Sequence, residues 1–196
     1  MKRLYNKSSL LLVFLTLFIS SGVFSQASLY TPYSFTTGGA SAFPAGTSVS
    51  FGTVALQDEN VIVLTPPGFN FQCGGAVYSN FLVSTNGWVA CIPSPAIPAY
   101  FATALPANSL SGYAGGTPLI APMWDDIAST TFVWSVVGTD LYIRWNSKMP
   151  KTGAGGYSFG VKLSAAGAIT FIYPTSVYNM SGAGANSASI GYASGC

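Results

Sequence analysis

Short runs of β-branched and aromatic residues recur from Thr47 onward, at intervals of about 8 to 12 residues, the spacing typical of a sandwich or barrel. In one run, Leu141, Ile143 and Trp145 alternate with polar or amphipathic residues, which predicts a strand with one buried face. After residue 25 we find no useful stretch with helical periodicity. The pattern therefore predicts an all-β fold, an antiparallel β-sandwich of about ten short strands. The predicted strands are Val49–Val54, Val61–Leu64, Phe69–Cys73, Phe81–Ser84, Trp88–Cys91, Ile120–Trp124, Phe132–Val137, Leu141–Trp145, Tyr157–Leu163, Ile169–Tyr173 and Ser187–Tyr192.

Glycine-containing dipeptides separate several of these runs. Asn86-Gly87 follows Phe81–Ser84, and both residues tolerate the positive φ of a type I′ hairpin, so we predict that turn there. Gly138-Thr139 and Ala166-Gly167 predict two further hairpins.

The stretch 93–118 breaks the strand pattern with prolines and small residues, apart from a possible short helix near Ala99–Ala104. We interpret it as a long loop, and long structured loops often carry function. Residues 26–46 are polar and rich in turn formers, and we interpret them as a lead-in to one β-sandwich domain at 47–196.

The first 25 residues predict a cleavable signal peptide. Lys2, Arg3 and Lys7 precede the apolar stretch Leu10–Ile19, and small residues then lead to a cleavage site before Gln26. An uncleaved anchor is the alternative, and it is disfavoured because no cluster of stop-transfer charges follows. No later apolar run is long enough to cross a bilayer without interruption. We therefore expect a secreted or cell-surface protein that is not an integral membrane protein.

Charge separates the signal from the rest of the chain. The whole sequence has 7 basic and 5 acidic residues, but three basic ones lie in the signal, which leaves four against five and a net charge of −1. No basic patch remains for nucleic acid, so we expect no nucleic-acid partner. Only 6% of the residues are charged, far below the usual quarter or so, and self-association is therefore left open.

The chain has three cysteines. Export to an oxidising compartment favours a Cys73–Cys91 disulfide, with two buried free thiols as the alternative. Cys196 is then unpaired, and it either bonds to another chain or marks a sequence that stops short of the natural C-terminus.

Candidate chemistry is sparse. The chain has no histidine, which excludes Ser-His-Asp and Cys-His catalysis and the usual zinc sites that contain histidine. Asp58-Glu59 occurs in a turn sequence. Asp125 and Asp126 close an apolar strand, where a carboxylate can bind Ca²⁺ or, in the interpretation we favour, accept backbone hydrogen bonds. We predict no catalytic residues and no required cofactor, and we leave Ca²⁺ open.

Four tryptophans and many tyrosines offer stacking surfaces for sugars, but most lie in strand patterns and are expected to pack in the protein. Tyr100 and Tyr113 lie in the predicted loop and are the better ligand-binding candidates.

Two segments in succession resemble the paired signature of NIDO-like (nidogen extracellular-type) domains: Phe81-Leu-Val-Ser-Thr-Asn-Gly-Trp-Val89 and Leu119-Ile-Ala-Pro-Met-Trp-Asp-Asp126. Later hairpins at Thr131–Trp145 and Tyr157–Tyr173 and a closing strand at Ala188–Gly191 follow the family's order. The resemblance covers Phe69 to Gly195. Similar modules occur in exported surface proteins of type IX-secreting bacteria, although this sequence lacks their later domains. The resemblance implies an adhesive or matrix module, and it brings no catalytic residues.

We therefore predict a non-catalytic binding or adhesion module for an extracellular protein or glycan, acting through the 93–118 loop. The alternatives are a self-assembling surface-layer subunit and, less favoured, a carbohydrate-active enzyme.

Overall fold

The computed structural model describes residues 42–53, 56–102, 110, 113, 115–125, 127–148, 156–173 and 189–193. The predicted signal peptide (1–25) and most of the predicted lead-in (26–46) lie outside the described residues. So do Asp126 and Cys196. None of the helices that the structure describes has the length and apolar character needed to cross a membrane.

The described elements are almost entirely strands, which confirms the all-β prediction. In chain order they are β1 (Thr47–Ser50), β2 (Val61–Leu64), β3 (Phe71–Cys73), β4 (Ala76–Tyr78), β5 (Asn80–Ser84), β6 (Val89–Ile92), α2 (Ala99–Ala102), β7 (Leu119–Trp124), β8 (Ala128–Val137), β9 (Asp140–Lys148), β10 (Gly156–Ser164), β11 (Ile169–Ile172) and β12 (Ser189–Ala193).

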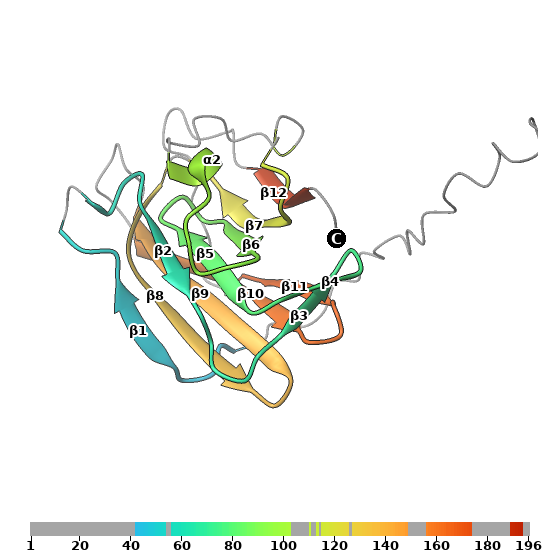
Figure 1. The fold of residues 1–196 in the computed structure, drawn as a ribbon. Coiled ribbons are helices and arrows are strands. Elements are labelled where there is room, and N and C mark those ends of the chain that lie inside the picture. The colour runs from blue at the N-terminus through green and yellow to red at the C-terminus, as the bar shows by residue number, and fades with distance from the viewer. Residues whose placement is uncertain are drawn as a thin grey trace, which may run out of the picture. The chain divides into compact units, whose positions relative to one another are not determined.

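Within the described residues these strands form two antiparallel five-stranded sheets and one separate hairpin (Figure 1). Sheet A has the order β1-β8-β9-β10-β11, and sheet B has the order β12-β7-β6-β5-β2. The separate hairpin is β3-β4. The predicted antiparallel sandwich is therefore confirmed, with the long hairpin β8–β9 at the centre of sheet A.

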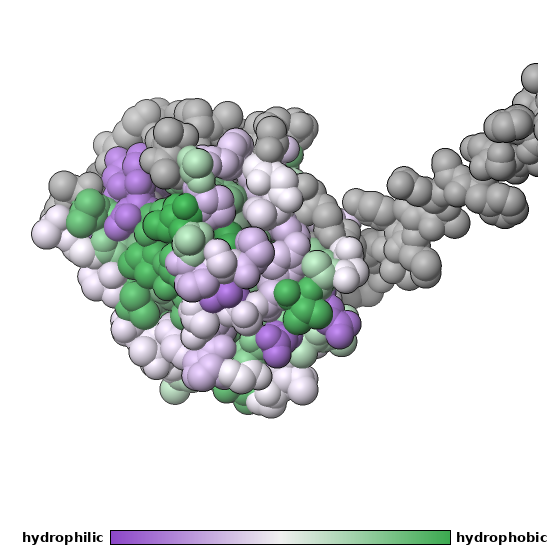
Figure 2. Space-filling view, in the orientation of Figure 1, coloured by the Kyte–Doolittle hydropathy of each residue, from purple (hydrophilic) through white to green (hydrophobic). Residues whose placement is uncertain are grey.

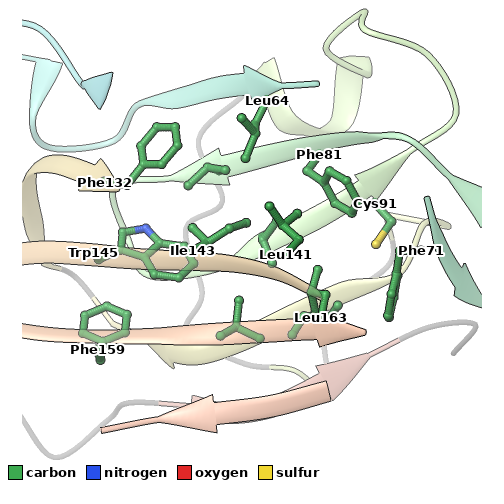
Figure 3. Packing of buried hydrophobic residues seen from close by; sticks show 14 of the residues in the cluster. Leu64, Phe71, Phe81, Cys91, Phe132, Leu141, Ile143, Trp145, Phe159 and Leu163 are labelled. Carbon is green, nitrogen blue, oxygen red and sulfur yellow. The ribbon is translucent and has the colours of Figure 1, made fainter. Parts of the chain in front are cut away.

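The main hydrophobic core lies between the two sheets. Alternate residues of sheet A, such as Leu141, Ile143 and Trp145 on β9, are fully buried in one cluster with Phe81 and Cys91 from sheet B (Figure 3). The polar or amphipathic residues between them are only partly buried. This two-residue alternation is the pattern that identified β9 in the sequence.

Sheet B is buried on both faces. Every residue of β5, β6 and β7 is buried, and a second hydrophobic cluster covers the face turned away from sheet A. That cluster contains Leu82, Trp88, Ala90, Ile92, Phe101, Leu119, Ala121 and Trp124. Since Phe101 belongs to α2, the 93–118 loop supplies part of the cover over this outer face.

The predicted type I′ turn at Asn86-Gly87 is wrong. The Ser84 N–H donates to the Trp88 carbonyl oxygen (3.0 Å), and the Gly87 N–H donates back to the Ser84 carbonyl oxygen (3.3 Å). This pairing closes a three-residue loop, in which Gly87 has a positive φ (76°) and Asn86 does not. A type I turn followed by a left-handed glycine has this arrangement, so one glycine suffices and the asparagine keeps ordinary backbone geometry.

The other turns and boundaries show smaller differences. The turn at Ala166-Gly167 repeats the three-residue form, with the Gly167 N–H donating to the Ser164 carbonyl oxygen (2.8 Å). Val137 pairs with Asp140 across a two-residue turn. The strand β4 was not predicted: it turns back on β3 through Gly74 and Gly75, whose positive φ values (57° and 80°) are those of a two-residue I′ turn.

Candidate functional site

Five aromatic rings gather on the outer face of sheet B, and we call them the aromatic cluster: Trp88, Tyr100, Phe101, Tyr113 and Trp124. Trp88 packs edge-on against Trp124 and contacts Phe101, with centroid separations of 6.5 and 5.4 Å. Tyr113 lies 6.3 Å from Phe101 and 5.6 Å from Tyr100. These separations are those of favourable aromatic pairs, so the rings support one another from the sheet outward.

Sheet B and the 93–118 loop together build this cluster. Trp88 immediately precedes β6, and Trp124 ends β7, so both indoles come from sheet B. Phe101 and Tyr100 come from α2, whose turn is set by the Phe101 N–H donating to the Pro98 carbonyl oxygen (2.9 Å). Tyr113 is fixed by a hydroxyl contact with Thr117 (3.0 Å between oxygens).

The cluster changes from buried to exposed along its length. Trp88 and Trp124 are each 1% exposed and Phe101 is 4% exposed, whereas Tyr100 is 37% exposed. Tyr113 is half-buried, and this burial raises the pKa of its hydroxyl to about 12, against a smaller opposing effect of the Thr117 hydrogen bond. Tyr100 and Tyr113 therefore form the accessible rim, and the other three rings form a rigid floor.

An apolar strip lies at the β2 edge of the same outer face. Val61 and Val63 on β2, an edge strand of sheet B, are partly buried and pack against the second cluster. Figure 2 shows apolar surface over β2, beside more polar neighbouring surface. The aromatic cluster and this strip together give sheet B an apolar outer surface that reaches solvent.

The floor also contains polar atoms. Within the described residues, the indole N–H groups of Trp88 and Trp124 are buried without a hydrogen-bond partner. A buried donor without a partner typically costs about 1–3 kcal/mol. The floor of the cluster is therefore not purely hydrophobic, because it contains two buried polar N–H groups.

The two signature segments of the sequence meet at the C-terminal end of β7. The Met123 N–H donates to the Gly87 carbonyl oxygen (3.3 Å), and the Asp125 N–H donates to the Asn86 carbonyl oxygen (3.3 Å). A Cβ on Gly87 would lie 2.0 Å from the Met123 carbonyl oxygen. Glycine is thus required here both by its positive φ and by the close approach of β7.

A buried polar network supports this junction. The Ser129 hydroxyl donates to the Thr85 carbonyl oxygen (2.6 Å) and contacts the Ser147 hydroxyl (2.7 Å). Asn86 is 3% exposed, and its amide donates to a Glu59 carboxylate oxygen (3.2 Å). These contacts hold the turn between β5 and β6 against sheet A.

The predicted carboxylate pair is only half described. Asp125 is 5% exposed and follows β7 directly, and Asp126 lies outside the described residues. Among the residues that the structure describes, no group of three or more His, Cys, Asp or Glu side chains is placed to hold a metal ion. The structure brings Tyr100 and Tyr113 together and places Asp125 in the buried junction.

The predicted Cys73–Cys91 disulfide is wrong, because Cys91 is a free, buried thiol. Cys91 lies on β6 beside Phe81 of β5 and is fully buried in the main core. Cys73 lies on the separate hairpin, where its cross-strand partner is Ala76. Burial also raises the pKa of the Cys91 thiol, so it stays protonated and unreactive.

The residues that sequence reasoning missed are the floor of the aromatic cluster. Trp88 and Trp124 were expected to pack in the protein, and they do, but on the outer face of sheet B under Phe101. The unbroken apolar run Leu119–Trp124 carried the relevant signal, since a strand without alternation is buried on both faces. That run implies a cover over the outer face, and the 93–118 loop is the segment that precedes it.

A family model described as "NIDO related" matches residues 32–195. No curated protein and no solved structure matches the chain.

Proposed function

Because the chain belongs to the NIDO-related family, whose domains are of an extracellular type, we propose that it is a binding module that recognises its ligand with the rim of the aromatic cluster. The observation that carries the proposal is the pairing of a half-exposed tyrosine, Tyr100, with Tyr113 above a rigid aromatic floor. Exposed aromatic rings held in place bind with little loss of conformational freedom.

The charge distribution favours an uncharged ligand. Of the cationic side chains that the structure describes, Lys162 pairs with Asp140 (3.6 Å) and Arg144 lies over the ring of Phe43 (5.7 Å). Both cations belong to sheet A, not to the outer face of sheet B. An acidic ligand would find no described cation at the rim, whereas the apolar face of a neutral sugar can stack on tyrosine rings.

We therefore assign the rim to an uncharged glycan, and an extracellular protein is the alternative outcome of the test. The proposal includes adhesion as its biological consequence and assigns no catalytic step to the chain. Its support is that the single described residue of the carboxylate pair, Asp125, is buried at the signature junction and not at the rim.

The test is a glycan and matrix-protein array with the purified protein, run with and without Ca²⁺. Tyr100→Ala should lower binding by about 5- to 150-fold, if stacking on this ring contributes the roughly 1–3 kcal/mol known for bases on aromatic side chains. Val137→Ala is the matched control, because Val137 is an exposed apolar residue (52%) on the β8 end of sheet A. Light scattering on the same samples detects self-association, which would imitate binding.

Four results bear on the proposal. Glycan binding that Tyr100→Ala removes and Val137→Ala preserves supports it. Binding of a matrix protein with the same sensitivity keeps the rim but changes the ligand class. Binding that neither variant affects would place the ligand elsewhere, and release of shortened glycan products would show that the chain is an enzyme.

A further inference from the structure

The cysteines of this chain have a pairing that differs from the one the sequence favours. The chain has three cysteines. Cys73 is disulfide-bonded, and Cys91 is a free thiol. We propose that Cys73 is bonded to Cys196, which lies outside the described residues, and that this bond fastens the C-terminal strand of sheet B to the β3–β4 hairpin.

Cys91 is a poor partner for physical reasons. It is fully buried between the sheets, and Figure 3 shows its sulfur beside Phe71 in the packed core. Its backbone is held by the Cys91 N–H, which donates to the Pro118 carbonyl oxygen (2.8 Å). Thiol–disulfide exchange requires a thiolate that the incoming reagent can reach, and Cys91 offers neither charge nor access.

The register of sheet B directs the end of the chain toward Cys73. Ala193 of β12 pairs with Leu119 of β7, which in turn pairs with Ala90 of β6. All neighbouring strands are antiparallel, so β12 runs in the opposite direction to β5. The C-terminal end of β12 therefore lies at the end of the sheet where β5 begins with Asn80. The β3–β4 hairpin immediately precedes Asn80, so it lies at this same end of the sheet.

The hairpin then crosses toward the β12 side of the sandwich. The Gln72 N–H donates to the carbonyl oxygen of Ala165, which lies in the turn between β10 and β11 (3.3 Å). A Cβ on Gly167 in the same turn would lie 2.8 Å from the Gln72 carbonyl oxygen. Figure 1 shows β3 and β4 beside β11. Because β10 packs near β7, the neighbour of β12, the hairpin lies across the end of the core on the β12 side.

Few residues separate the end of β12 from Cys196. Cys196 is three residues beyond Ala193, and three extended residues span about 10 Å. Cys73 itself is fixed by the tight turn at Gly74 and Gly75 and is 4% exposed. The hairpin therefore presents one sulfur at a defined position, at the same end of sheet B as the C-terminal end of β12.

The bond forms by exchange with a disulfide reagent, either an exported thiol oxidoreductase or a small disulfide such as oxidised glutathione. The two thiols of Cys73 and Cys196 lose two electrons and two protons, and one S–S bond forms between them. The reagent's S–S bond breaks, and its two sulfurs take up those electrons and protons and leave as thiols. The product is a covalent loop that spans 123 positions (196 minus 73) and encloses β4 to β12.

The test is peptide mapping of the full, exported protein by mass spectrometry without reduction. We expect one cross-linked species that contains Cys73 and Cys196 and separates into its two peptides on reduction. Thiol titration in denaturant should find one thiol per chain, and titration of the native protein should find none because Cys91 is buried. Cys73→Ser and Cys196→Ser should each raise the denatured thiol count to two and lower the Tm by about 5–15 °C.

Cys91→Ala is the matched control, since it should leave the cross-linked species intact whatever it does to stability. A peptide joining Cys73 to Cys91 would overturn the proposal. So would a reducible dimer in which Cys73 is linked to a second chain, or three free thiols in protein prepared under oxidising conditions. The inference does not depend on the proposed ligand, because these readouts involve no binding.

Discussion

Replacing Gly87 by alanine tests the junction of the two signature segments. Gly87 has a φ of 76°, and this left-handed conformation costs an L-residue about 1–2 kcal/mol. The added Cβ would also lie 2.0 Å from the Met123 carbonyl oxygen and 2.9 Å from the ring of Phe159. Both neighbours are held in the packed core, so the turn itself must move.

That movement has a further cost. Displacing the turn from β7 weakens the hydrogen bonds from the Met123 N–H to Gly87 and from the Asp125 N–H to Asn86, both 3.3 Å long. Each bond contributes about 0.5–1.5 kcal/mol, and more when a buried group is left without a partner. We therefore expect Gly87→Ala to lower the free energy of unfolding by about 3–5 kcal/mol.

Gly138→Ala is the matched control. Gly138 has a similar φ (62°) in the turn between β8 and β9, but no atom lies within 4 Å of its ideal Cβ. It should lose only the backbone cost of about 1–2 kcal/mol. Urea unfolding followed by tryptophan fluorescence measures both, with unchanged m-values as evidence that the denatured states are comparable.

The difference between the two variants is the informative quantity. A gap of 2 kcal/mol or so, or loss of folded protein for Gly87→Ala alone, agrees with the close approach of β7. Equal destabilisation would refute it, because the backbone conformation would then account for the whole effect and the carbonyl contact would contribute nothing.

Three further measurements follow from particular contacts. Trp145→Phe removes the indole hydrogen bond to the Ser84 carbonyl oxygen (2.7 Å) that joins the two sheets, and should cost about 2–3 kcal/mol in urea unfolding; no loss would contradict that role. Because the pKa of Tyr113 is raised to about 12, the folded state holds this proton more tightly than the unfolded state, so stability should fall as pH rises from about 10 to 12. This loss of stability should be smaller in the Tyr113→Phe variant. An equal loss in both proteins would show that Tyr113 is not the group responsible. When the protein is stretched from its two ends, adding reductant should lengthen the unfolded chain by about 43 nm, since 123 positions between Cys73 and Cys196 are released; an unchanged length would argue against the bond.

Strands of sheet A such as β9 and β10 could be predicted because their side chains alternate. On β9 every second residue enters the core, and the sequence shows this directly. Turn geometry could not be predicted in the same way. Asn-Gly suits a two-residue I′ turn, but it also suits a three-residue turn with glycine in the left-handed position. The choice depends on register: pairing Ser84 with Trp88 keeps Val83 and Val89 on the core face, and neighbouring residues do not reveal this.

The aromatic cluster and the cysteine pairing were harder to predict for a related reason. Tyr100, Phe101 and Tyr113 lie in a segment without periodicity, so nothing in the local pattern shows which strand they cover. Cys73 and Cys91 are only 18 positions apart in the sequence (91 minus 73), but the free thiol of Cys91 belongs to the core between the sheets, whereas Cys73 lies on the separate β3–β4 hairpin. Both features depend on contacts between segments that are distant in sequence.

Fold and ligand recognition should respond to different substitutions in this family. The signature residues Asn86 and Gly87 are engaged with β7 and are buried or closely packed, so their variants should change stability and leave the ligand's identity unaffected. Tyr100 lies between the two signatures and is 37% exposed, so Tyr100→Ala should reduce ligand binding while lowering the free energy of unfolding by only about 1–3 kcal/mol through its two lost ring contacts. If Gly87→Ala abolished binding in protein that is still fully folded, the ligand would bind at the signature junction instead. An effect confined to Tyr100 would instead place ligand recognition in the 93–118 loop, outside the two signature segments that identify the family.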